Sequence, residues 1–173
     1  ERGGLNLVHM LTHKGAGCEL AAGDPNRLHG MKPTKTRSDG EADPPAGKPV
    51  PKRPPYTNVF ARKAVELAKS DASIMGVTAA MPDGTGLKLM ADELPGRCHD
   101  VGICEQHAVA LAGGMAKGGL RPIVAIYSTF LQRAYDQVFQ ELLIQEANVV
   151  LAMDRSGLVD DGCTHHGLFD IAY

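Results

Sequence analysis

The sequence predicts an α/β fold in which a parallel β-sheet is flanked by helices. From residue 56 onward, helical and strand-like segments alternate along the chain, and such a succession is typical of a parallel sheet with helices on both faces. Hydrophobic residues make up 43% of the 173 residues, which is enough to bury a core. At roughly 100–200 residues per domain, this length accommodates one domain and part of another.

Spacing and flanking residues predict the individual elements. Thr57 is the expected N-cap of the first helix, because a side-chain oxygen there accepts a hydrogen bond from a free amide of the first turn. Apolar, β-rich runs predict strands, and longer stretches with helical spacing predict helices. In chain order we expect a helix over 57–67, a strand at 74–78, a loop rich in Gly and Pro, a helix at 87–93, a strand at 98–101, a helix at 104–117, a strand at 121–127, a helix at 130–146 and a strand at 148–153.

The first 55 residues differ in composition from the rest. They contain eight of the eleven prolines, and within them only the run 5–11, which stops at a Gly-Ala-Gly turn signal, resembles a strand. Prolines, glycines and charges over 32–55 predict an irregular connector that cannot provide a packed face. We therefore expect three parts: 1–31 as the end of one domain, 32–55 as a Pro-rich connector, and 56–173 as an incomplete second domain of a fragment that begins at Glu1 rather than Met.

Charge and apolar patterning exclude several function classes. The chain has 18 Lys and Arg against 20 Asp and Glu, so it lacks the basic excess of a nucleic-acid groove. Its longest apolar stretches, 108–116 and 149–153, are far shorter than the roughly 20 residues that span a bilayer. Four irregularly spaced cysteines favour reduced thiols in a cytoplasmic protein.

The loops that follow the predicted strands contain most of the unusual chemistry. Ligands of open α/β sheets bind beyond the carboxyl ends of the strands, which directs attention to 79–86, 102–105, 127–130 and 154–167. Glu105 precedes Gln106 and His107, three side chains that can exchange protons or hydrogen bonds. Alternatively, Glu105 is a first-turn acid favoured by the helix dipole. Residues 160–167 combine two acids, a thiol, a hydroxyl and two imidazoles, which is denser than a plain turn requires.

Five segments of the second part have distinctive sequences: D-V-G-I-C-E-Q-H-A-V at 100–109, Y-S-T-F-L-Q-R-A-Y-D-Q-V at 127–138, L-A-M-D-R-S-G-L-V at 151–159, T-H-H-G at 164–167 and F-D-I-A-Y at 169–173. These segments are similar to the 1-deoxy-D-xylulose-5-phosphate synthase family of transketolase-like thiamine diphosphate enzymes, with looser similarity at 9–17 and 22–29. The similarity is long and covers most of the chain except the connector. The resemblance implies that 1–31 is the C-terminal end of a diphosphate-binding domain and that 56–173 is the N-terminal part of a transketolase-like pyrimidine-binding domain.

The resemblance also implies an activity. Enzymes of this family are transferases that condense pyruvate with D-glyceraldehyde 3-phosphate, release CO2 and form 1-deoxy-D-xylulose 5-phosphate for isoprenoid and thiamine biosynthesis. The family suggests a homodimer that uses thiamine diphosphate and Mg²⁺. Since no Gly-Asp-Gly followed some 25–30 residues later by Asn occurs here, we assign no metal ligand to this chain and expect the Mg²⁺ ligands outside it.

Cofactor residues follow from the resemblance, position by position. Glu105 matches the catalytic glutamate that hydrogen-bonds the N1′ nitrogen of the aminopyrimidine and so promotes removal of the thiazolium C2 proton. Tyr127 and Phe130 match aromatic residues that line the pyrimidine pocket, where a ring favours stacking, although both could be ordinary loop and core residues. Cys18 stands where the family has an aromatic residue associated with the cofactor.

Substrate residues follow in the same way. Arg155 matches an arginine that holds the substrate phosphate, a role suited to a guanidinium group, and Tyr127 is expected to contact substrate as well as cofactor. Arg133 is either a second contributor or a structural ion pair. Asp161 and His165 match the polar pair that positions substrate and relays protons, and His29 matches a histidine near the same site. Asp161 is preferred to its neighbour Asp160 because it adjoins the glycine of the motif.

Two alternatives remain open at the level of sequence. Another transketolase-like thiamine enzyme, such as transketolase or the β subunit of the decarboxylating pyruvate dehydrogenase component, would share the fold. A zinc-binding interaction module would use Cys98, His99, Cys104 and His107, but their spacing fits no common structural zinc site.

Overall fold

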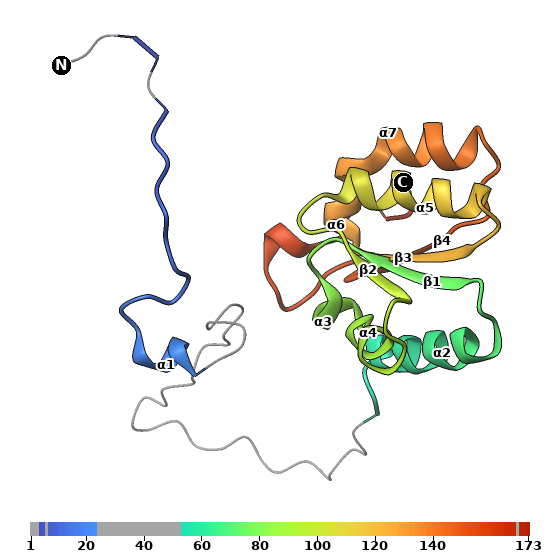
Figure 1. Cartoon of the computed structure of the whole chain (residues 1–173), viewed down its shortest axis with the longest axis horizontal. Helices are drawn as coiled ribbons and strands as arrows, with labels where there is room; N and C mark the ends of the chain where they lie inside the picture. Colours follow the sequence, from blue (N-terminus) through green and yellow to red (C-terminus); the bar gives the residue numbers. More distant parts are fainter. Residues whose placement is uncertain (1–3, 6, 24–52, 169) are drawn as a thin grey trace. The chain divides into compact units, whose positions relative to one another are not determined.

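The computed structural model describes residues 4–5, 7–23, 53–168 and 170–173. By its internal contacts the chain divides into two units, Glu1–Val50 and Pro51–Tyr173 (Figure 1), and each is described here by itself. No helix in these ranges is long and apolar enough to cross a membrane.

The described part of the first unit contains one short helix, α1 (Glu19–Ala22), after a turn at 14–17. The strand expected over 5–11 is wrong for the described residues of that run, which form no strand. Leu5, Leu7 and Leu11 are exposed. A strand needs a neighbour for its backbone N–H and C=O groups, and no described residue of this unit supplies one.

The second unit is built on a four-stranded parallel sheet with the order β2-β1-β3-β4. The strands are β1 (Ile74–Thr78), β2 (Cys98–Asp100), β3 (Arg121–Tyr127) and β4 (Val150–Asp154). Residues 122–126 of the central strand β3 are all buried, as expected for a strand covered on both faces. The predicted parallel sheet is confirmed.

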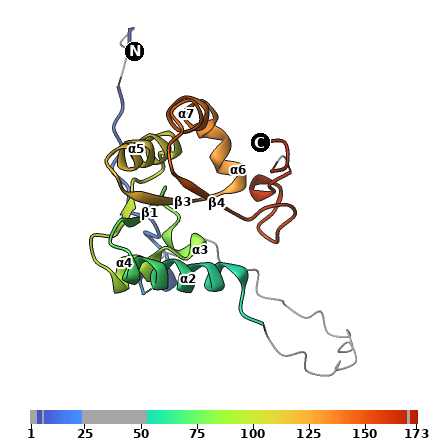
Figure 2. The same cartoon turned by 90° about the vertical axis from the view of Figure 1, so that its right-hand side faces the viewer.

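Helices cover both faces of this sheet, as Figure 2 shows. On one face lie α2 (Tyr56–Ser70) and α4 (Lys88–Glu93), which pack on Ile123 and Ala125. On the other lie α5 (Glu105–Lys117) and the helical segment after β3, which pack on Val124 and Ile126. Alternate residues of β3 thus serve two separate hydrophobic clusters, because successive side chains of a strand point to opposite faces.

The helical segment after β3 changes its hydrogen-bonding pattern along its length. It consists of α6 (Ser128–Leu131), a 3₁₀ turn η1 (Gln132–Ala134), α7 (Tyr135–Gln137) and a π-helix η2 (Val138–Leu143). The helix expected at 130–146 is therefore present, but it begins two residues earlier and is not uniformly α-helical. A short helix α3 (Pro82–Thr85) also occupies the predicted loop after β1.

The N-cap predicted for α2 is wrong. Pro55 is the N-cap, and Thr57 lies inside the first turn. The Thr57 hydroxyl does not cap the helix but donates a hydrogen bond to the Asp154 carboxylate (3.0 Å) at the end of β4. A contact across 97 positions of sequence has replaced the local one.

Strand order reverses between β1 and β3, because the chain moves outward from β1 to β2 and then returns to the other side of β1. Asp100, at the end of β2, accepts hydrogen bonds from the backbone amides of Ala80 (2.7 Å) and Gly102 (3.0 Å). This carboxylate fixes the loop after β1 to the loop that leads into α5. Ligands of open α/β sheets bind at such a reversal.

Candidate functional site

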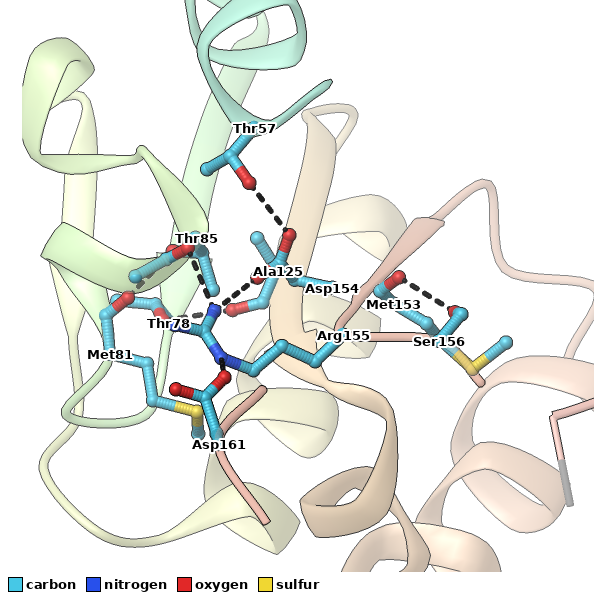
Figure 3. Close-up of polar contacts among 11 residues, drawn as sticks. Thr57, Thr78, Met81, Thr85, Ala125, Met153, Asp154, Arg155, Ser156 and Asp161 are labelled. Atoms are coloured by element: carbon cyan, nitrogen blue, oxygen red, sulfur yellow. Dashed lines mark hydrogen bonds and ion pairs between the residues drawn. The ribbon is translucent and has the colours of Figure 1, made fainter. Parts of the chain in front are cut away.

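The described candidate residues of the second unit gather beyond the carboxyl ends of β3 and β4. Arg155 follows β4 directly and has a left-handed backbone (φ 58°), which non-glycine residues seldom adopt. Its Nε donates to Asp161 Oδ2 (2.8 Å), and its Nη1 donates to the Gly84 carbonyl (3.2 Å) and pairs with Asp154. Figure 3 shows these side chains converging around the guanidinium group. Arg155 thereby connects the segment after β4 to the segment after β1.

Electrostatically, Arg155 is already matched by two carboxylates. Asp154 and Asp161 bracket it, and Thr57 holds the other oxygen of Asp154. A phosphate group that binds Arg155 must therefore compete with these acids, and Asp161, on an exposed loop, is the partner better able to move.

An aromatic cluster lies against this arginine. The Arg155 guanidinium carbon is 3.8 Å from the centroid of the Tyr127 ring, a favourable cation–π distance. Tyr127 stacks on Phe130 (centroids 5.8 Å apart), and His165 meets Phe130 edge-on at 5.2 Å. Burial raises the pKa of the Tyr127 phenol, and Arg155 partly opposes this shift. The hydroxyl group is therefore protonated at neutral pH.

Glycine is required beneath the Tyr127 ring. A Cβ atom on Gly84 would lie 2.6 Å from Tyr127 Cζ and 2.9 Å from Cε1, far inside the 3.5–4.0 Å of ordinary carbon contacts. The close approach of α3 to the ring thus depends on the absence of a side chain at residue 84.

Glu105 is a buried carboxylate at the first turn of α5, with 2% of its surface exposed. Its two oxygens lie 3.3 and 3.4 Å from Arg133 Nη1, so the buried charge has a counter-ion, as such charges require. The Arg133 guanidinium carbon is also 5.7 Å from the centroid of the Phe130 ring. Arg133 therefore makes the ion pair that the sequence allowed as an alternative, and it links Glu105 to the aromatic cluster.

For two predicted site residues the structure gives no placement relative to this cluster. Cys18 belongs to the first unit, where it is exposed between the turn at 14–17 and α1, and its position relative to the second unit is not described. His29 lies outside the described residues. Within the second unit, Asp160 makes no polar contact with described residues, whereas Asp161 contacts Arg155.

Sequence reasoning missed the residues that support the site. They are Thr57, Gly84, Ser128, Asp154 and Asp170. All but Asp154 act on partners far away in sequence, whereas Asp154 pairs with the adjacent Arg155. Only Asp154 carried a usable signal, as a charged residue at the end of an apolar strand next to Arg155.

The zinc alternative has no site in the described residues. They contain no group of three or more His, Cys, Asp or Glu side chains placed to hold a metal ion. Burial raises the pKa of the Cys98 thiol to about 11, which disfavours the thiolate that zinc binds. Cys98 is thus a poor zinc ligand, and the described structure does not gather it with His99, Cys104 and His107 into a metal site.

A family comparison matches the second unit. Residues 52–173 match the family described as "Transketolase, pyrimidine binding domain".

Curated relatives extend the similarity to nearly the whole chain. The 1-deoxy-D-xylulose-5-phosphate synthase of Desulfitobacterium hafniense (strain DSM 10664 / DCB-2) is 51% identical over 96% of this chain, which corresponds to 26% of that protein. The enzyme of the same name from Heliobacterium modesticaldum is 52% identical over 96% of this chain and 25% of its own length. The chain spans about a quarter of the length of these relatives.

Among solved structures, the chain is similar to one titled "Split gene transketolase, inactive beta4 tetramer". The TM-score is 0.57 and the identity 24%, and the match covers 66% of this chain and 37% of the other. At that identity the likeness concerns the fold alone.

Proposed function

Because the chain belongs to the transketolase pyrimidine-binding domain family, we propose that it provides the pyrimidine half of a thiamine diphosphate site in a 1-deoxy-D-xylulose-5-phosphate synthase. The observation that carries the proposal is the buried Glu105 carboxylate, which Arg133 joins to the stacked Tyr127–Phe130 pair. A flat heterocycle that offers a ring nitrogen to a carboxylate and a face to aromatic side chains suits this donor set. The aminopyrimidine of thiamine diphosphate has both properties.

Glu105 is the proposed catalytic group at the ring. Its carboxylate would share a proton with N1′ of the pyrimidine, and its burial strengthens that hydrogen bond by excluding water. When bound, thiamine diphosphate supplies a carbon centre that adds to a 2-oxo acid and stabilises the electron pair left by loss of CO2. Tyr127 and Phe130 would orient the pyrimidine and exclude water from its face.

The remaining candidates would serve the substrates. Arg155 would bind the phosphate of D-glyceraldehyde 3-phosphate, since guanidinium groups form paired, charge-assisted hydrogen bonds with phosphate. Arg133 pairs with Glu105 and would add its charge to the site from that position. Asp161 and His165 would hold pyruvate or the acceptor and move protons, with Tyr127 beside them. We include His29 and Cys18 as residues of the first unit that would complete the same site.

The rest of the assembly is proposed from the relatives' identity. Residues 1–31 would end the diphosphate-binding domain, 32–55 would connect it to the pyrimidine domain at 56–173, and Mg²⁺ would be held with the diphosphate by residues outside this chain. A homodimer is supported by an exposed apolar stripe, Tyr135, Phe139 and Leu143, at helical spacing of four residues. A cytoplasmic location is supported by the four unpaired cysteines, all in the described ranges, because disulfides are rare in that compartment.

Product analysis of the full-length protein tests the proposed activity. With pyruvate, D-glyceraldehyde 3-phosphate, thiamine diphosphate and Mg²⁺, we expect one CO2 released per 1-deoxy-D-xylulose 5-phosphate formed. Two-carbon transfer between sugar phosphates without CO2 would instead identify a transketolase. Decarboxylation of pyruvate with transfer of the product to a lipoyl group would identify a pyruvate dehydrogenase component.

A further inference from the structure

The loop between β4 and the end of the chain is closed at its base by two glycines. Gly157 N–H donates to the Gly167 carbonyl (3.2 Å), and Gly167 N–H donates to the Gly157 carbonyl (2.9 Å). Between them lie Asp161 and His165, the two loop residues proposed to act on substrate. Most of the intervening residues are exposed, so the position of the loop depends on its base.

One carboxylate ties this base to the end of β3. Asp170 Oδ2 accepts a hydrogen bond from Gly157 N–H (2.7 Å), and its Oδ1 accepts one from the Ser128 hydroxyl. Ser128 is 3% exposed and directly follows Tyr127. The loop is thereby anchored to the residue that adjoins the aromatic cluster.

The packing at this point leaves no room for adjustment. A Cβ atom on Gly167 would lie 2.6 Å from Ser128 Oγ and 2.7 Å from Asp170 Oδ2. The backbone of Gly167 is therefore pressed against the Ser128–Asp170 pair. Hydrogen bonds to an ionised carboxylate are roughly twice as strong as neutral ones, so Asp170 is well suited to hold a loop with few other contacts.

We infer that Ser128 and Asp170 are positioning residues, which hold the loop 156–167 so that Asp161 reaches Arg155 and His165 reaches Phe130. This inference rests on the proposed function, because the roles of Asp161 and His165 belong to it. It gives a function to the aspartate of the segment 169–173, to which sequence similarity alone assigned none. Neither Ser128 nor Asp170 is proposed to touch the substrate.

Hydrogen exchange and kinetics of the full-length enzyme test the inference. Asp170→Asn keeps the volume but replaces one acceptor oxygen by an NH2 group, and Ser128→Ala removes only the hydroxyl. In both variants we expect amides of residues 156–167 to exchange about tenfold faster, with those of 121–127 unchanged. The kcat/KM for the phosphorylated acceptor should fall about tenfold, whereas the dissociation constant of thiamine diphosphate should stay within about twofold.

Asp160→Asn is the matched control, because it removes the same charge ten positions earlier, within the loop, at a residue without described polar contacts. It should alter neither exchange nor kinetics. Three outcomes would overturn the inference. They are unchanged hydrogen exchange of the loop in both test variants, an equally large effect of Asp160→Asn, and accelerated exchange that extends into residues 121–127. Exchange is measured without turnover, so faster loop exchange in a protein that makes no 1-deoxy-D-xylulose 5-phosphate would refute the proposed activity and leave the anchor standing.

Discussion

Gly84→Ala adds one methyl group at the point where α3 meets the Tyr127 ring. The new Cβ would lie 2.6 Å from Cζ and closer still to the phenolic oxygen, so the methyl group and the phenolic end of the ring must separate by roughly 1–2 Å to reach ordinary contact. Two other neighbours confine the Tyr127 ring: the Phe130 ring, with centroids 5.8 Å apart, and the Arg155 guanidinium carbon, 3.8 Å from the Tyr127 centroid. The substitution must therefore displace the aromatic cluster rather than a free side chain.

The expected cost follows from these contacts. Overpacking of this kind costs about 1–3 kcal/mol, and a displacement of about 1 Å at a catalytic site can lower turnover about 100-fold. We expect kcat/KM of the full-length enzyme to fall between about 10- and 100-fold. Gly84 has no positive φ, so backbone strain does not contribute.

A second substitution and a control make the test specific. Tyr127→Phe removes the oxygen that the new methyl meets first, so Gly84→Ala/Tyr127→Phe should be more active than the product of the two single effects predicts. Gly114→Ala in α5 is the control, because no atom lies within 4 Å of its added Cβ, and it should be neutral or slightly stabilising. Normal activity of Gly84→Ala, or additive effects in the double variant, would refute the reasoning.

Three other predictions address the arginine cluster and the thiols. Thr57→Val removes the hydrogen bond to Asp154. The loss of this hydrogen bond, worth about 1 kcal/mol, should lower kcat/KM for the acceptor about fivefold in steady-state assays. An unchanged kcat/KM would show that Asp154 needs no support from α2. Arg155→Lys loses the paired hydrogen bonds of the guanidinium group and its stacking on Tyr127. We therefore expect the KM for the acceptor to rise about tenfold, with the KM for pyruvate nearly unchanged. A rise in the pyruvate KM with an unchanged acceptor KM would contradict the proposed role of Arg155. Burial raises the pKa of Cys98 from 9.0 to about 11, so its thiolate fraction at pH 8 is about 100-fold lower than that of an ordinary cysteine. Mass spectrometry should therefore show that iodoacetamide modifies Cys98 more slowly than the exposed Cys104 and Cys163. Equal rates of modification would count against the burial of Cys98.

The parallel sheet was predictable because its signals are local. The run 122–126 is apolar throughout and forms the buried part of β3, and the stretch 104–117 forms α5 within one residue of expectation. Their hydrophobic periodicity determines which element forms regardless of what lies elsewhere in the chain.

The failures have a common cause in contacts between distant residues. Thr57 has the residue type of an N-cap, but the Asp154 carboxylate, 97 positions away, accepts its hydroxyl hydrogen. The run 5–11 has the composition of a strand but no described neighbour in its unit to pair with. The contact of Arg155 with the Gly84 carbonyl was equally invisible, because 71 positions of sequence separate the two residues.

The central claim is that Glu105 is the carboxylate of a thiamine diphosphate site, and Glu105→Gln in the full-length enzyme tests it most directly. Gln keeps the size of the side chain, and the half-exposed Arg133 (54%) can be hydrated after losing its partner, so the fold should persist. In parallel titrations and turnover assays, we predict that the variant binds thiamine diphosphate within about tenfold of the wild-type affinity, while kcat for 1-deoxy-D-xylulose 5-phosphate falls by about 100- to 10,000-fold. Turnover within about threefold of wild type would contradict the account.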